Sequence, residues 1–407
     1  MRSVNRIGTL LAIFLLAPVT RGSDAKPAEE LAGLKREAEA AMKALGESTK
    51  PGTPEAEQAA AGERYREQSR GLARRALALA EAHPDAPEAV EALAWIFTIC
   101  DLGAECDAAY DLMAIRFLDK DAILPIARTA CDSAAWTAHA GLFLRAAAER
   151  SPNLKLKALA CFSLARHQQL MAHLKRLIDD PIRGETLQEM MGPENLRRVR
   201  AVDREAARRE AEALFERTLK EFADLRPLGK DFPPLGELAE GALYRLRNLD
   251  VGCTAPEVEA EDVEGRPLKL SDFRGKVVVI AFWASWCGPC MEMVPDEKAL
   301  CERMKGRPFV LLGVNGDDDR GRAKEVAAKA GIPWRSFWNG GHDGPISLKW
   351  GVTQWPTNYV IDARGVIRRD DTLRSPMLDK VVEALVAEAE TARKNETATP
   401  QPRRTDP

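Results

Sequence analysis

The clearest chemical signature in the sequence is a pair of cysteines separated by two residues. Cys287 and Cys290 enclose Gly288 and Pro289, and Trp286 precedes them. Two thiols at this spacing, at the start of a helix, can reach each other and cycle between dithiol and disulfide. The unpaired N–H groups and the positive dipole end of such a helix lower the pKa of the first thiol. Pro289 fits the first helical turn because that position needs no N–H donor.

Such a dithiol can exchange with other disulfides. The Cys287 thiolate attacks a substrate disulfide to form a mixed disulfide, and Cys290 then displaces the substrate thiol. A zinc site would need four ligands, and neither a second Cys-x-x-Cys nor a His pair lies nearby. A purely structural bridge is the other alternative, disfavoured by the short loop beside an exposed Trp286. The sequence therefore favours a redox-active pair that uses neither a metal nor another cofactor.

The segments around the cysteines predict the elements that hold them. Val277–Trp283 is a continuous apolar run, typical of a strand buried on both faces, and residues 291–305 have a helical pattern. The alternation continues with a strand at 309–314, a helix at 320–330, strands at 357–362 and 366–369, and a helix at 376–391. This order predicts an α/β domain.

In this region the chain resembles the thioredoxin superfamily, in particular the extracytoplasmic TlpA/ResA-type thiol–disulfide oxidoreductases with redoxin-like sequence. The resemblance covers residues 251–391 and implies a thioredoxin fold there. It rests on five motifs in order: Gly252-Cys253-Thr254-Ala255-Pro256 with the run 270–276, the segment 282–290, Pro295, Gly313-Val314-Asn315, and Trp355-Pro356-Thr357 before Ile361-Asp362.

The resemblance implies a substrate-binding loop at Trp355 and Pro356. By this likeness the Trp355–Pro356 bond is cis, Pro356 faces the Cys287 sulfur, and the backbone of Trp355 pairs with an extended substrate strand. A bulky Trp355 departs from the usual small residue, so the family's substrate preference is not carried over.

The same resemblance leaves the group that deprotonates Cys290 unassigned. Thioredoxin itself has an Asp six residues before the first cysteine, where Ala281 stands here. The TlpA/ResA group has a Glu two residues before the helix proline, where Met293 stands. Glu292 lies one position away, about 100° round the helix, and is our hypothesis for the proton acceptor. Water or the thiolate pair itself is the alternative.

An acidic run at Asp317-Asp318-Asp319 precedes the predicted helix 320–330. It lacks the alternating spacing and the terminal Glu of a calcium loop. We therefore expect these residues to cap the helix N-terminus.

Residues 27–245 predict an all-α region. Ala, Leu, Arg and Glu recur at spacings of three and four, which is typical of amphipathic helices, and prolines separate the helices. The rhythm resembles tetratricopeptide or other solenoid repeats, although no 34-residue consensus aligns. Cys100 and Cys106 flank a predicted turn and could form a disulfide or be buried as small apolar residues, and Cys131 and Cys161 have the same alternatives. A protein-binding or dimerising module and a plain spacer are both open for this region.

The amino terminus has the pattern of a secretory signal peptide. Arg2 and Arg6 precede a short apolar run at 7–19, and small residues follow. The run is shorter than the roughly 20 residues of a membrane-spanning helix. We expect a signal peptide over 1–25, or an uncleaved anchor, and a periplasmic or secreted protein in which disulfides persist. The polar tail 392–407 predicts disorder.

Composition limits the remaining classes. The 59 Lys and Arg residues nearly balance 62 Asp and Glu, so the net charge of −3 gives no basic field for nucleic acid. Eight cysteines in 407 residues are too few for a disulfide scaffold. The sequence predicts a two-part fold: an all-α, helical-repeat or solenoid-like N-terminal domain (27–245) and a C-terminal α/β thioredoxin fold (251–391).

The predicted function is a thiol–disulfide oxidoreductase that reduces protein disulfides outside the cytoplasm. Its expected partners are protein dithiols or disulfides and an unidentified thiol redox donor. The Gly-Pro pair between the cysteines, as in reducing thioredoxins, favours reduction. A peroxide-reducing redoxin would need a Thr three residues before its reactive cysteine, where Ala284 stands. The third hypothesis is a helical interaction protein whose thioredoxin-like domain mainly binds partners.

Overall fold

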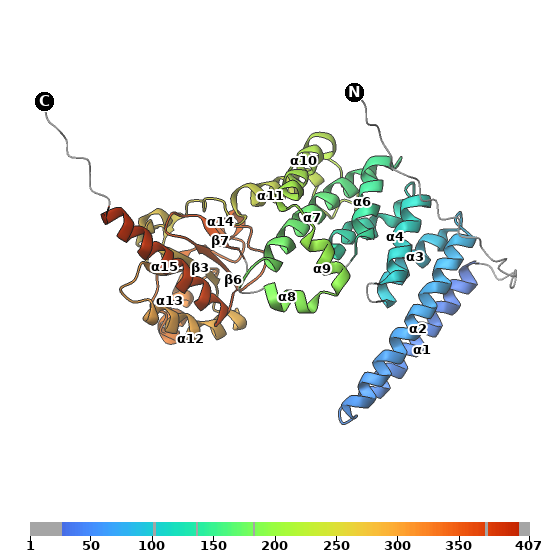
Figure 1. Cartoon of the computed structure of the whole chain (residues 1–407), viewed down its shortest axis with the longest axis horizontal. Helices are drawn as coiled ribbons and strands as arrows, with labels where there is room; N and C mark the ends of the chain where they lie inside the picture. The colour runs from blue at the N-terminus through green and yellow to red at the C-terminus, as the bar shows by residue number, and fades with distance from the viewer. Residues whose placement is uncertain (1–26, 101–102, 136, 182–183, 371–372, 399–407) are drawn as a thin grey trace. The chain divides into compact units, whose positions relative to one another are not determined.

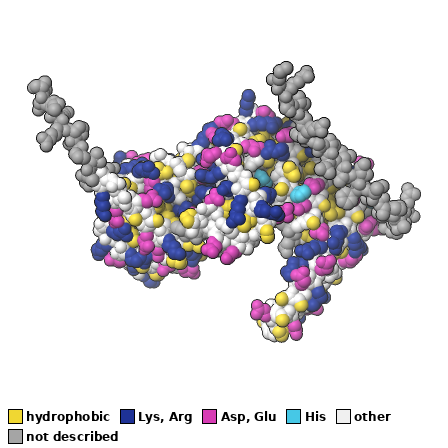
Figure 2. Space-filling view, viewed as in Figure 1, with side chains coloured by type: hydrophobic (Ala, Val, Ile, Leu, Met, Phe, Trp, Pro, Cys, Tyr) yellow, Lys and Arg dark blue, Asp and Glu magenta, His cyan; other side chains and the backbone are white. Residues whose placement is uncertain are grey.

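The computed structural model describes residues 27–398 except 101–102, 136, 182–183 and 371–372. The predicted signal peptide lies outside the described residues. Among the described helices, none combines the length and the apolar character needed to cross a membrane. Basic and acidic side chains are interspersed over the face drawn in Figure 2.

Internal contacts group the chain into two compact units, 1–109 and 110–407. The predicted boundary lies elsewhere, near 245–251, so the later helices share one unit with the α/β part. The first unit holds α1 (Pro27–Ser48), α2 (Glu55–Ala82), α3 (Pro87–Ile99) and the start of α4 (Ala104–Arg116). Helices α1 and α2 lie side by side (Figure 1), and their apolar stripes bury Leu34 and Ala76.

The second unit begins with a layer of helices packed around α7 (Leu154–Ile178). Asn153 caps α7 because its side chain accepts the N–H groups of Lys155 and Leu156. The other elements of this layer are Asp121–Ile123 (η1), Leu124–Thr129 (α5), Ala130–Ala135 (η2), His139–Arg150 (α6), Gly184–Met190 (α8), Pro193–Arg200 (α9), Arg204–Phe222 (α10) and Leu235–Asn248 (α11). The helical prediction is confirmed, and a repeat relationship among these helices stays a prediction.

The cysteines of the helical region are thiols inside this packing. Cys106, Cys131 and Cys161 are buried, and burial raises the pKa of Cys106 to about 12 and that of Cys131 to about 11. Half-buried Cys100 donates its thiol to the carbonyl of Ser69. Burial as small apolar residues is thus shown for Cys106, Cys131 and Cys161, whereas Cys100 is only partly buried.

A five-stranded sheet with the order β5-β4-β3-β6-β7 forms the centre of the C-terminal part. Its central strand β3 pairs in parallel with β4 and antiparallel with β6. The strands are Val277–Trp283 (β3), Phe309–Asn315 (β4), Ser336–Trp338 (β5), Thr357–Ile361 (β6) and Ile367–Arg369 (β7), and a separate hairpin joins Glu259–Glu261 (β1) to Pro267–Lys269 (β2), which the 3-10 turn Leu270–Phe273 (η3) follows.

Both faces of β3 are buried because its side chains alternate between two cores. On one face Val277 and Val279 pack with α12 (Gly288–Arg303) and α15 (Met377–Ala398). On the other face Ile280 and Phe282 pack with residues of α14 (Pro345–Lys349) and the segment after it. The remaining helix is α13 (Arg320–Ala330). The helical region and this α/β domain together confirm the two-part fold class.

The last helix extends beyond its predicted end. Helix α15 continues to Ala398, so the prediction of a disordered tail is wrong for residues 392–398, and 399–407 lie outside the described residues. Residues such as Ala392, Arg393 and Lys394 have high helix propensity. Arg393 also donates to the carbonyl of Gly275 at 2.5 Å, which holds this turn against the domain.

Candidate functional site

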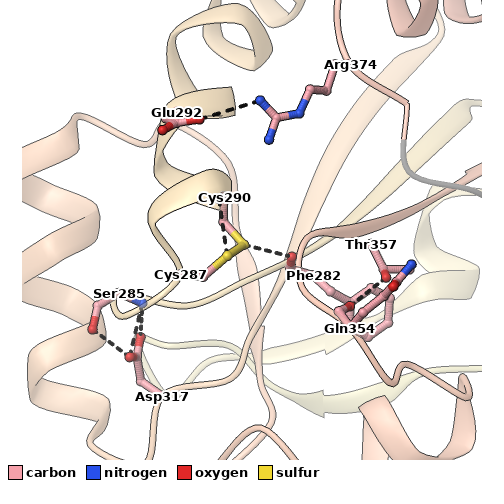
Figure 3. The surroundings of a disulfide bond; sticks show 9 residues. All are labelled: Phe282, Ser285, Cys287, Cys290, Glu292, Asp317, Gln354, Thr357 and Arg374. Atoms are coloured by element: carbon pink, nitrogen blue, oxygen red, sulfur yellow. Dashed lines mark hydrogen bonds and ion pairs between the residues drawn. A yellow bond between two sulfur atoms is a disulfide. The ribbon is translucent and has the colours of Figure 1, made fainter. Parts of the chain in front are cut away.

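The two cysteines lie where β3 passes into α12. Strand β3 ends at Trp283, three residues form the elbow, and Cys287 is the N-cap of the helix. Cys287 and Cys290 form a disulfide with an S–S distance of 2.00 Å and a Cα–Cα distance of 5.3 Å (Figure 3). The structure is therefore of the oxidised pair, and the predicted strand–helix context of the cysteines is confirmed.

The sulfur of Cys287 meets the helix N-terminus. It accepts the backbone N–H of Cys290 at 3.2 Å, a donor of the first helical turn that also reaches the Cys287 carbonyl at 3.1 Å. Pro289 lies in this turn, where its missing N–H costs nothing. After reduction, the same donor and the helix dipole stabilise a thiolate on Cys287 over a thiol.

Aromatic rings surround the disulfide. Trp355 packs against a small core of Trp283, Ala284 and the two cysteines. Its ring centroid is 5.6 Å from that of Trp286, which is 53% exposed. The cysteines themselves are only 3–4% exposed, so little of the disulfide is open to solvent.

In the loop before β6, one expectation from the resemblance is met, and the facing of Pro356 toward the Cys287 sulfur stays a prediction. The Trp355–Pro356 peptide bond is cis, and a second cis bond, Ser375–Pro376, was not anticipated. The bulky Trp355 fits because residue 316 has no side chain: a Cβ on Gly316 would lie 2.5 Å from the Trp355 ring. The departure from a small residue is thus compensated by a glycine 39 positions earlier in the chain.

A buried carboxylate holds the elbow before Cys287. Asp317 accepts the backbone N–H of Ser285 at 3.0 Å and the Ser285 hydroxyl at 2.7 Å, and Figure 3 shows the two side chains facing each other. Asn315 donates to the same carboxylate at 2.8 Å, and Arg322 donates to the Ser285 hydroxyl oxygen at 2.9 Å. These bonds fix the backbone that carries Trp286 to the helix.

The acidic run 317–319 was predicted to cap the helix, and the structure shows that role for Asp319. Asp319 is the N-cap of α13 and accepts the N–H groups of Gly321 and Arg322. Asp317 instead turns inward to Ser285, 32 residues away in sequence. No local pattern marks that pairing.

Glu292 lies away from the disulfide. Its side chain is 70% exposed and pairs with Arg374 at 3.6 Å, on the outer side of α12 (Figure 3). A carboxylate so exposed and so directed has no observed contact with Cys290 among the described residues. The geometry therefore does not favour Glu292 as proton acceptor, and that role stays a prediction.

A different carboxyl on α12, that of Glu297, is buried, and it was not among the predicted site residues. Glu297 is 6% exposed, and burial, together with the nearby Asp296 charge, raises its pKa to about 7. It follows Cys290 by seven residues, which places both on one helix face about 10 Å apart along the axis. That i, i+7 relation is the signal that could have drawn attention to Glu297.

Comparisons with known proteins concern this same part of the chain. Residues 251–370 match the model of the AhpC/TSA family. The thiol-disulfide oxidoreductase ResA of Bacillus thuringiensis subsp. konkukian is 27% identical over 130 residues, which are 32% of this chain and 74% of that protein. The thiol:disulfide interchange protein DsbE of Vibrio cholerae is 32% identical over 128 residues, 30% of this chain and 66% of that one.

A solved structure of a thiol-disulfide oxidoreductase from Bacteroides fragilis also matches. It is 26% identical with a TM-score of 0.31, and the match covers 32% of this chain and 99% of that structure. Each similarity spans about a third of the present chain. The motifs around Cys287 and the similarity to ResA and DsbE agree on one assignment. Over this part the chain is similar to ResA-like thiol–disulfide oxidoreductases of the thioredoxin superfamily.

Proposed function

We propose that the protein reduces disulfides of other proteins outside the cytoplasm, with Cys287 as the attacking and Cys290 as the resolving cysteine. The observation that carries the proposal is the Cys287–Cys290 disulfide at the N-terminus of α12, with the Trp355 ring of the cis-proline loop packed against it. The Gly-Pro pair between the cysteines supports the reducing direction.

Each proposed step balances within thiol chemistry. The Cys287 thiolate attacks one sulfur of the substrate disulfide, so that the Cys287–substrate bond forms, the substrate S–S bond breaks and one substrate thiolate leaves. Cys290 loses its proton and attacks the Cys287 sulfur, which closes the Cys287–Cys290 bond and expels the second substrate thiolate. Protons from solvent and from Cys290 complete the two substrate thiols.

The cycle then needs two electrons to reopen the disulfide. A dithiol donor supplies them by the same exchange run on Cys287 and Cys290, so these steps use no further cofactor. The signal-peptide pattern of residues 1–25 supports a location outside the cytoplasm, where substrate disulfides persist.

An insulin-disulfide reduction assay with a dithiol donor tests the proposal. Cys287→Ser should abolish turnover, because the attacking sulfur is gone. Cys301→Ser is the matched control, since Cys301 is a half-buried thiol of the same helix and should keep wild-type turnover. Equal turnover in Cys287→Ser and wild type would contradict the proposed function and favour the partner-binding hypothesis.

Peroxide reduction by a redoxin-like domain is the competing activity. Ala284 stands three residues before Cys287, where that chemistry needs a Thr. We therefore expect hydrogen peroxide consumption by the reduced protein to be slow compared with disulfide reduction. Faster turnover of peroxide than of insulin would reverse the order of the two hypotheses.

A further inference from the structure

A cavity of about 1040 Å³ lies between the helical layer and the α/β part, within the unit 110–407. Helices α7, α10 and α11 form one wall, and residues 347–353 of α14 and the following loop form part of the other. This volume is at the upper end of the range of ligand pockets. None of the thiol-exchange steps above makes use of it.

The segment of residues 342–355 connects this cavity with the disulfide site. At its start, the His342 ring lies 6.4 Å from the ring of Trp286. Its middle, including Leu348 and Thr353, lines the cavity. Two residues after Thr353, the ring of Trp355 packs against Trp286 and the cysteine core. A chain bound at Trp355 can therefore continue along this segment into the cavity.

The cavity lining combines apolar groups with charges of both signs. Leu348 is 66% exposed, and Leu238 of the opposite wall is also exposed. Arg245 and Glu237, both in the lining, form no ion pair among the described residues. An anion or a lipid would require one sign of charge or a continuous apolar lining, whereas a polypeptide offers apolar, acidic and basic groups together.

Ion pairs hold the helical wall in place. Arg176 near the end of α7 pairs with Asp370 at 2.7 Å, and Arg369 of β7 pairs with Asp180 at 2.5 Å, with all four side chains largely buried. The stem of Arg245 also lies close over Gly351, where a Cβ would meet its Cδ at 2.9 Å. The two walls are thus fixed to each other, so the cavity is formed before any substrate binds.

We infer that this cavity binds an extended segment of the protein substrate whose disulfide reacts at Cys287. The inference rests on the proposed function and deepens it: the helical layer supplies half of a polypeptide-binding cleft. It assigns the protein a preference for disulfides in unfolded or extended chains over small-molecule disulfides.

Trapped complexes of the full chain test the inference directly. In Cys290→Ser the mixed disulfide cannot be resolved, so a peptide whose single cysteine is activated with thionitrobenzoate stays attached to Cys287. A photoreactive benzoylphenylalanine is placed about three to eight residues from that cysteine, since an extended chain advances about 3.3 Å per residue. We expect crosslinks to α11 (Leu235–Asn248) and α14.

The outcomes of this experiment are distinct. Crosslinks confined to surfaces outside the cavity lining would overturn the inference while leaving the proposed function intact. Failure to form any mixed disulfide at Cys287 would contradict the proposed function, and the inference with it.

Kinetics provide a second test with a matched control. Leu348→Asp and Arg245→Glu should each lower kcat/KM for an unfolded protein disulfide about tenfold, relative to kcat/KM for dithiobisnitrobenzoate. Leu154→Asp replaces an equally exposed leucine at the start of α7, outside the lining, and should leave both values unchanged. Equal effects on the two substrates, or no effect on either, would overturn the inference.

Discussion

The α/β part and the helical part both bury cysteines, but they bury them against different surroundings. Cys287 and Cys131 are each less than 5% exposed, so exposure does not distinguish them. Cys287 lies at a helix N-terminus and meets a backbone N–H, whereas Cys131 lies in packing whose desolvation raises its pKa to about 11. Cys131 donates its thiol to oxygen atoms, whereas Cys287 accepts an N–H, so we expect the donor at the sulfur, and not exposure, to separate a reactive cysteine from an inert one.

The largest expected effect is a difference in thiol reactivity. In the reduced native protein at pH 7, iodoacetamide should modify Cys287 at least about 100-fold faster than Cys131, because a thiol of pKa near 11 is almost entirely protonated there. Mass spectrometry of peptides after timed quenching measures both rates. Similar rates for the two residues would remove the distinction between the two regions.

The next effect concerns the buried carboxylate of Asp317, which holds the elbow before Cys287. Asp317→Asn replaces an acceptor-only carboxylate with an amide whose NH₂ faces the donors of Ser285 and Asn315. We expect a loss of about 2–4 kcal/mol in the free energy of unfolding and slower disulfide reduction.

Asp319→Asn is the matched control for this change. Asp319 caps α13, and Asn is an equally good N-cap, so the free energy of unfolding should change by less than about 0.5 kcal/mol. Denaturant titration of both variants checks the pair. A similarly small effect of Asp317→Asn would mean that the buried carboxylate does not hold the elbow.

The buried Glu297 of the α/β part predicts that the free energy of unfolding depends on pH. Its folded pKa of about 7 exceeds the unfolded value of 4.5, so the folded state binds the proton more tightly. This contribution to stability is fully present below about pH 4.5 and is lost as the pH rises through 7, by about 3 kcal/mol in total.

Glu297→Gln should remove this decline, whereas Glu302→Gln, at an exposed position of the same helix, should keep it. Urea unfolding of the three proteins at pH 5 and pH 8 measures the difference. An unchanged pH dependence in Glu297→Gln would show that the buried carboxyl does not titrate as its surroundings require.

The smallest expected effect concerns the packing of Trp355. Gly316→Ala places a methyl group 2.5 Å from the indole, so the ring must shift, at a cost of about 1–3 kcal/mol. Gly288→Ala is the control, because a Cβ there meets nothing within 4 Å. Thermal unfolding compares the two, and equal stability would show that Trp355 has room to move.

Much of the α/β part could be predicted because its signals are local. Val277–Trp283 was predicted with its observed bounds, since a strand buried on both faces is continuously apolar. Helix α13 was also predicted with its observed bounds, between an acidic cap and Gly331. The sequence signals for these elements lie within a few neighbouring residues.

The features that escaped prediction depend on residues distant in sequence. Asp317 belongs to a local acidic run, but its partner Ser285 is 32 residues away. Trp355 looks anomalous until Gly316 is placed beside it. The joining of the later helices to the α/β part depends on ion pairs such as that of Arg176 with Asp370, which no periodicity reveals.

The central claim is that Cys287 and Cys290 form a reducing dithiol, and their reduction potential tests it most directly. Equilibration of the full chain against glutathione buffers, read by the alkylated fraction, gives the value. We expect a potential near that of thioredoxin, about −270 mV. A potential near about −120 mV, as in the strong oxidant DsbA, would contradict it.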